Sequence, residues 1–98
     1  MKTYELLDSA EKWCKGANAR DKDGNIVDPV SSIANQWCIN GALCRCYRKV
    51  SDMSAASDKL SNLLTGHISF PAVPYINWQD ETERTFEEVH QLLKEADV

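Results

Sequence analysis

Residues 33–47 constrain the fold more than any other part of the chain, with the sequence Ile-Ala-Asn-Gln-Trp-Cys-Ile-Asn-Gly-Ala-Leu-Cys-Arg-Cys-Tyr. Drawn as an α-helix with 100° per residue, this stretch places apolar side chains such as Trp37 and Ile39 on widely different faces. A helix that is apolar over most of its circumference belongs in the middle of a fold, where several elements contact it. The pattern therefore predicts a central buried helix over residues 33–49.

Three further segments have apolar residues at helical spacing. The first predicted helix covers about residues 4–15 and ends at Gly16 as a cap. Another covers about residues 51–65 and ends at Thr65-Gly66. The last covers about residues 86–96 and begins at the capping box Thr85-Phe86-Glu87-Glu88. For the central helix, Ser31 or Ser32 is the expected cap, because the apolar pattern begins at Ile33.

A turn signal separates the first helix from the central one. Asp23-Gly24 accepts positive φ at low cost, so the sequence predicts a short β-hairpin here. Residues 21–25 also have oxygen ligands at alternate positions, like the start of an EF-hand calcium loop. That loop needs a glycine at its sixth position and a glutamate at its twelfth, where this chain has Ile26 and Ser32. We expect a hairpin rather than a calcium site.

The size of the chain fits one domain. It has 98 residues, of which 43% are hydrophobic, enough to build one modest core. The predicted fold class is mainly α, with about four helices packed around a central buried helix and a short β-hairpin between helices one and two. Residues 1–98 are expected to form a single compact domain.

Charge and apolar runs bear on the compartment and the partners. No run approaches the roughly 20 apolar residues of a membrane span, and Glu5 and Asp8 interrupt any secretory core near the N-terminus. We expect a cytoplasmic location, no membrane contact and reduced thiols at Cys14, Cys38, Cys44 and Cys46. The net charge is −4, and residues 76–98 hold seven acidic and two basic groups. This balance disfavours direct nucleic-acid binding and suits a protein partner with a basic surface.

Cys38 is the main candidate for catalysis, as a nucleophile with His67 or His90 as the base. Its reactivity depends on where the central helix begins. With Asn35 as cap, Cys38 lies in the first turn and its pKa falls. With the upstream serines as cap, Cys38 lies in the second turn among apolar neighbours. The caps and the apolar pattern favour this second arrangement, in which Cys38 is a small buried hydrophobe.

A metal site finds little support. Structural zinc usually takes its ligands in close pairs. On a helix, Cys44 and Cys46 would point about 200° apart, so they cannot bind one ion together. We expect no metal and no cofactor.

Binding residues are expected towards the C-terminus. Aromatic and amide side chains beside prolines are common in recognition loops, which makes Tyr75, Asn77 and Trp78 candidates, with Asp80 beside them. Acidic residues of the last predicted helix, and one just before it, extend this surface: Glu83, Glu87 and Glu88. The structural alternative for Tyr75 and Trp78 is that both rings pack on the central helix. The alternative for the acidic residues is a helix face that is simply exposed to solvent. Trp13 and Trp37 are expected in the core.

Three sequence blocks carry a resemblance: Gly16-Ala17-x-Ala19-x-Asp21-x-x-Gly24, Trp37-Cys38-Ile39-Asn40-Gly41-Ala42-Leu43, and Trp78-Gln79-Asp80 ahead of Arg84-Thr85-x-x-x-Val89-x-x-Leu92-Leu93. In them the chain resembles an uncharacterised family of small bacterial and phage proteins with a Trp-Cys-x-x-Gly-Ala helix and a Trp-Asn-Asp-type loop before the C-terminal helix. Gln79 stands where that family has Asn. The resemblance implies a bacterial or phage genome and brings no established activity.

The leading functional expectation is a non-enzymatic, small acidic accessory protein that binds another protein, as an inhibitor or regulator encoded by a phage or mobile element. The alternative is a small cysteine-dependent hydrolase or transferase that uses Cys38 with His67 or His90. A self-assembling structural protein is the third hypothesis.

Overall fold

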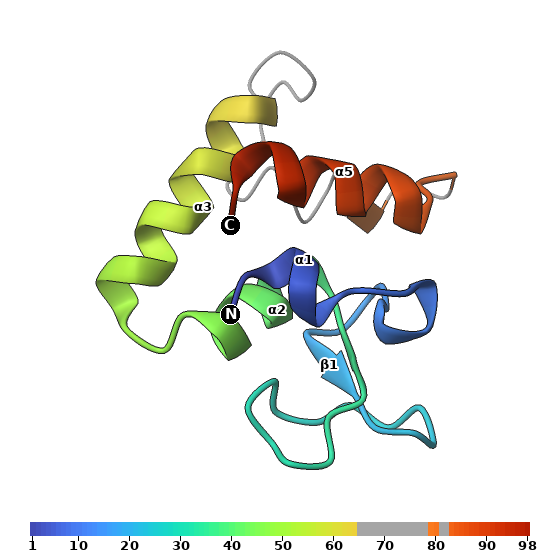
Figure 1. Ribbon diagram of the computed structural model, residues 1–98. Helices are drawn as coiled ribbons and strands as arrows, with labels where there is room; N and C mark the ends of the chain where they lie inside the picture. The colour runs from blue at the N-terminus through green and yellow to red at the C-terminus, as the bar shows by residue number, and fades with distance from the viewer. Residues whose placement is uncertain (65–78, 81–82) are drawn as a thin grey trace.

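The computed structural model describes residues 1–64, 79–80 and 83–98 (Figure 1). Its elements, in chain order, are α1 (Thr3–Leu6), the 3-10 helix η1 (Ala10–Lys12), β1 (Ala19–Arg20), β2 (Gln36–Trp37), α2 (Ile39–Cys46), α3 (Val50–Leu64) and α5 (Phe86–Ala96). The fold is mainly α, with a short antiparallel pair of strands before α2, which confirms the predicted fold class. No helix in these described ranges is long and apolar enough to cross a membrane.

The helices pack around α2 and α5. α2 contacts α1 and α3, and α5 contacts the same two helices. Figure 1 shows α5 on one side of α1 and α2, and the strands with their connecting loop on the other. Large side chains with less than 2% exposure come from α2, α3, α5 and the turn after α1: Leu7, Ile39, Leu43, Leu60, Val89 and Leu93. A helix at the centre of the core is what the apolar 33–47 stretch predicts.

The last helix forms where its local signals place it. α5 begins at Phe86 with Thr85 as N-cap, whose hydroxyl accepts a hydrogen bond from the Glu88 N–H, while the Glu88 carboxylate accepts one from the Thr85 N–H. This capping box satisfies two backbone donors that the helix itself leaves unpaired. α3 also covers its predicted range, and Ala56, Leu60 and Leu64 form its buried stripe.

The predicted helix over residues 4–15 is wrong in extent. α1 ends after one turn, and Ser9 is extended, with φ −149° and ψ 157°. Asp8 and Ser9 are poor helix-interior residues because their side chains compete for backbone hydrogen bonds. Farther on, Cys14 donates its N–H to the carbonyl oxygen of Trp37 at 3.1 Å. Pairing with a distant extended segment therefore replaces the helical hydrogen bonds expected there.

The central helix begins later than predicted and ends earlier. Residues 33–35 do not start a helix, and Gln36 and Trp37 form β2, paired with β1 in the register Ala19↔Trp37 and Arg20↔Gln36. The cap is Cys38, so neither Ser31 nor Ser32 serves as predicted. Strand pairing uses the backbone groups of β2 that a longer helix would need.

The predicted turn is present. Gly24 has φ +87°, and its N–H donates to the carbonyl oxygen of Asp21 at 3.1 Å. The Asp21 carboxylate accepts hydrogen bonds from the N–H groups of Asp23 and Asn25, each at 2.9 Å. These bonds lower the pKa of Asp21, that from Asn25 most strongly. The carboxylate closes its own turn, which is the usual role of an aspartate at this position.

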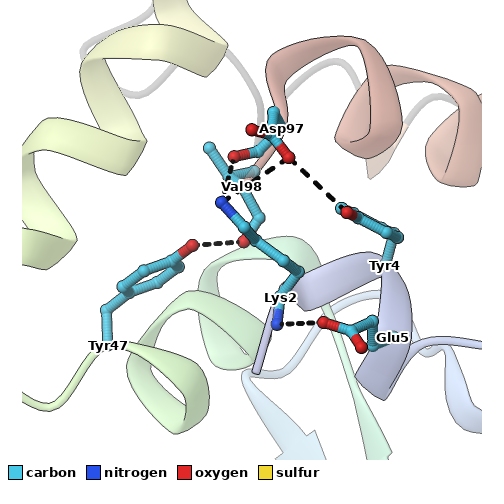
Figure 2. A network of polar contacts seen from close by, with 6 residues as sticks. All are labelled: Lys2, Tyr4, Glu5, Tyr47, Asp97 and Val98. Carbon is cyan, nitrogen blue, oxygen red and sulfur yellow. Dashed lines mark hydrogen bonds and ion pairs between the residues drawn. The ribbon is translucent and has the colours of Figure 1, made fainter.

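Polar contacts join the segment around Lys2 to Asp97 and Val98, a network that we call the terminal clasp (Figure 2). The Val98 backbone oxygen accepts hydrogen bonds from the Tyr47 hydroxyl at 2.6 Å and from the Thr3 N–H at 2.9 Å. Lys2 Nζ donates to the Asp97 backbone oxygen at 2.9 Å and pairs with its carboxylate at 3.5 Å. The terminal clasp holds α1, the end of α2 and the end of α5 together.

Gly41 allows the closest backbone approach around α2. A Cβ atom added there would lie 1.7 Å from the Asn18 carbonyl oxygen, far inside any permitted contact. That oxygen also accepts the Cys38 N–H at 3.2 Å. The segment before β1 therefore lies directly on the first turn of α2, and only glycine leaves room for it.

We predict that Gly41→Ala destabilises the protein by about 3 kcal/mol, through overpacking. The sign is diagnostic, because the same change in an ordinary helix interior stabilises by up to about 1 kcal/mol. Urea unfolding measures the effect, and Ser54→Ala, at an exposed position of α3, is the control, with a change under about 0.5 kcal/mol. A stabilised Gly41→Ala protein would contradict the close approach of Asn18.

Candidate functional site

Cys38 lies at the junction of β2 and α2. Its backbone is extended, with φ −81° and ψ 178°, and its Sγ accepts a hydrogen bond from the Gly41 N–H at 3.3 Å. The sulfur thus takes the place of the side-chain oxygen that usually caps a helix. Its S–H donates to Asn18 Oδ1 at 3.6 Å, and the residue is 4% exposed. The thiol is a structural part of the start of α2.

Burial controls the acidity of this thiol. It raises the pKa of Cys38, although the hydrogen bond from Gly41 acts in the opposite direction. Burial likewise raises the pKa of Cys14 to about 11, with Cys38 as the next cause. The thiolate is the nucleophilic form of cysteine, so a raised pKa keeps both groups protonated and unreactive at neutral pH. Cys38 is buried, as expected, but it reaches that state as a cap rather than inside the helix.

Gln79 is not among the site residues predicted from the sequence, yet its side chain connects its own segment with Trp13 and with the start of α2. Its side chain is 1% exposed. Its Oε1 accepts hydrogen bonds from the Ile39 N–H at 2.8 Å and from Trp13 Nε1 at 3.1 Å. Its Nε2 donates to Asp80 Oδ1 at 3.2 Å. The available signal was its place in the Trp78-Gln79-Asp80 block, one of the three blocks that carry the resemblance.

The three blocks that carry the resemblance meet at this junction. Cys38 and Gly41 belong to one block, Gln79 to another, and Asn18 lies within the third. A hollow of about 310 Å³ opens beside them, lined by Gly16, Ala17, Asn18, Cys38, Gln79 and Asp80. Its volume is at the lower limit for ligand pockets. Within the described residues, no group of three or more His, Cys, Asp or Glu side chains is arranged to hold a metal ion.

Of the two candidate bases, only His90 lies within the described residues. His90 Nε2 lies 3.1 Å from the Tyr4 carbonyl oxygen, and its ring stacks on Phe86 with centroids 5.2 Å apart. The polar partners of His90 and of the Cys38 sulfur are therefore different in the described structure. His67 lies outside the described residues.

The expected binding residues divide into three groups. Tyr75, Asn77 and Trp78 lie outside the described residues. Asp80, Glu83 and Glu87 are exposed to solvent. Glu88 is also exposed, but its carboxylate closes the α5 capping box and pairs with Arg84 Nη1 at 2.7 Å. The Thr85 N–H and then Arg84 lower the pKa of Glu88, so this charge is already engaged within the protein.

The two tryptophans fill structural roles. Trp37 is buried, its Nε1 donates to the Pro29 carbonyl oxygen at 2.9 Å, and Arg45 lies over its ring at 5.6 Å. Trp13 is partly buried against the core and donates to Gln79. The prediction that both rings belong to the core is confirmed for Trp37, whereas Trp13 is only partly buried against the core. Neither residue is in a helix.

We predict that Gln79→Met destabilises the protein by about 2–4 kcal/mol. Methionine keeps the length of the side chain but leaves two donors, the Ile39 N–H and Trp13 Nε1, buried without an acceptor. Urea unfolding measures the change. Gln91→Met, on the exposed face of α5, is the matched control and should cost less than about 0.5 kcal/mol. Equal effects of the two substitutions would remove Gln79 from its joining role.

Alkylation tests the state of Cys38. We expect iodoacetamide at mildly alkaline pH to modify Cys38 more slowly in the folded protein than in concentrated urea, because the thiol is buried and its pKa is raised. Peptide mass spectrometry follows each cysteine separately. Faster modification in the folded protein than in urea would mean that Cys38 is an activated nucleophile.

Comparison with known proteins places the chain in a family without assigning an activity. The model of DUF6197, described as a family of unknown function, matches residues 2–97. No curated protein and no solved structure matches the chain. Because the match spans nearly the whole sequence, the protein belongs to the DUF6197 family of unknown function.

Proposed function

We propose that this protein is a non-enzymatic, acidic accessory protein that binds another protein and thereby inhibits or regulates it. One observation carries the proposal: the sulfur of Cys38, the best nucleophile candidate in the sequence, is buried and caps α2. A thiol committed to a helix cap, with a raised pKa, is unsuited to nucleophilic catalysis. The proposed setting is the cytoplasm of a bacterial host cell, with a phage or mobile element as the source.

The proposed binding surface is the acidic face around α5. Glu83 and Glu87 are exposed at its start, and Glu95 is exposed near its end. Arg84 and Lys94 are the basic residues of this region, and Arg84 is paired with Glu88. A surface with this excess of negative charge steers a partner with clustered Lys and Arg towards it, which raises the association rate.

Charge reversal tests this surface. Tagged wild-type protein is used to isolate partners from the source cells, and the affinity of each is then measured with purified proteins. We expect Glu83→Lys/Glu87→Lys to weaken binding by about tenfold or more, mostly through a slower association rate. Asp52→Lys/Asp58→Lys on α3 is the control, because it makes the same charge change at exposed positions. Each pair also replaces one acidic residue in the first turn of a helix, Glu87 in α5 and Asp52 in α3.

The two pairs of substitutions separate specific docking from general attraction. Equal weakening by both pairs would show that only net charge matters. Unchanged binding by the α5 pair would remove α5 from the interface.

A cysteine-dependent hydrolase or transferase is the second candidate, favoured by the hollow of about 310 Å³ that Cys38 lines. It requires His67 or His90 to act as base. The alkylation measurement distinguishes the two candidates, since only the enzyme needs an activated Cys38.

A further inference from the structure

The loop between β1 and β2 exposes apolar side chains although it is held firmly. It covers residues 21–35, a length at which connections without secondary structure are usually functional. Ile33 is 60% exposed and Ile26 is 69% exposed, although isoleucine is among the residues most often buried in proteins. Figure 1 shows this loop on the side of the molecule away from α5. The loop is thus separate from the proposed acidic surface.

Hydrogen bonds from buried parts of the fold fix the loop at several points. Arg45 Nη1 donates to the carbonyl oxygens of Pro29 at 3.2 Å and Ser31 at 3.0 Å. Trp37 Nε1 also donates to Pro29. At the return of the loop, the Asn35 N–H donates to the Arg20 carbonyl oxygen at 2.8 Å. A loop ordered in advance loses little conformational entropy when it binds, which favours recognition.

A groove lies between the two arms of this loop. Its volume is about 460 Å³, and it is lined by Asp21, Lys22, Asp23, Ser32, Ile33, Ala34 and Asn35. The lining combines apolar Ile33 and Ala34 with the acidic residues Asp21 and Asp23, and Lys22 lies between these two in sequence. We call this hollow the loop groove. Its volume is within the range of sites that bind small ligands or a few side chains.

The charges around the loop groove indicate the occupant. Residues 21–35 contain three acidic groups, Asp21, Asp23 and Asp28, and one basic group, Lys22, so their net charge is 1 − 3 = −2. The lowered pKa of Asp21 keeps its carboxylate ionised. A second copy of this chain would bring a loop of the same charge, which would be repelled. A segment with Lys or Arg beside an apolar side chain complements both the acidic and the apolar lining residues.

We propose that the loop groove binds a short segment of a partner protein in which an apolar side chain packs on Ile33 and Ala34 and an adjacent Lys or Arg faces Asp21 and Asp23. The inference takes from the proposed function only that the protein binds other proteins. Its site is distinct from α5, so each can fail without the other.

Peptide selection tests the loop groove directly. The full chain is used to select peptides from a random displayed library, and enriched peptides are synthesised and titrated by fluorescence anisotropy. We expect them to combine an apolar residue with Lys or Arg and to bind more weakly in about 0.5 M salt. Ile33→Ser should weaken binding by about tenfold, and Asp23→Asn should weaken it by about threefold and reduce the salt dependence.

Matched variants identify the site. Ile26→Ser removes an equally exposed isoleucine of the same loop that does not line the groove, and it should leave peptide affinity unchanged. Glu83→Lys/Glu87→Lys should also leave it unchanged, which separates this proposal from the α5 surface. Unaltered melting temperatures show that each variant is folded. The proposal is overturned if no peptide is enriched, if enriched peptides lack basic residues, or if Ile33→Ser and Ile26→Ser act alike.

Discussion

The side-chain carbonyl of Gln79 is the acceptor on which the centre of this structure depends. It receives hydrogen bonds from the first N–H of α2, at Ile39, and from the indole of Trp13. The bond from Ile39 is buried and the bond from Trp13 is partly buried, and an unpaired buried polar group costs about 1–3 kcal/mol. The Cys38 sulfur accepts the Gly41 N–H of the same turn. Two side chains from distant parts of the chain thus satisfy the N-terminus of the central helix.

This arrangement gives a structural role to Cys38, the residue that first suggests catalysis. A cysteine at a helix N-terminus ordinarily gains acidity from the helix dipole. Here burial outweighs that gain and raises the pKa of Cys38. The resemblance blocks at Cys38, Gly41 and Gln79 therefore describe a structural junction. The two binding surfaces that we propose lie at its periphery, on the acidic face of α5 and in the loop groove.

Local signals in the sequence were sufficient for some elements. The capping box at Thr85 fixed the start of α5, and Asp23-Gly24 fixed its turn, because both depend on residues within a few positions. The extents of the first two helices could not be predicted in this way. They depend on pairing between segments far apart in sequence, as when the Cys14 N–H donates to the Trp37 carbonyl oxygen. Helical periodicity contains no information on such a competitor.

The site was predictable in part. Burial of Cys38 followed from its apolar neighbours, and Glu83 and Glu87, which were expected on a binding surface, are both exposed. The role of Gln79 could not be found, since nothing in the Trp78-Gln79-Asp80 block indicates that the glutamine contacts a helix 40 positions away. Ile33 begins the apolar pattern that predicts the central helix, yet it lies outside α2 and is exposed, because the residues after it pair as a strand.

A double-mutant cycle between Trp13 and Gln79 tests the central claim most directly. Trp13→Phe, Gln79→Met and the double variant are compared with the wild type by urea unfolding. The structural account predicts a coupling energy of about 1 kcal/mol, because the two side chains share one partly buried hydrogen bond. Additive effects, with a coupling near zero, would show that Gln79 does not join Trp13 to the start of α2.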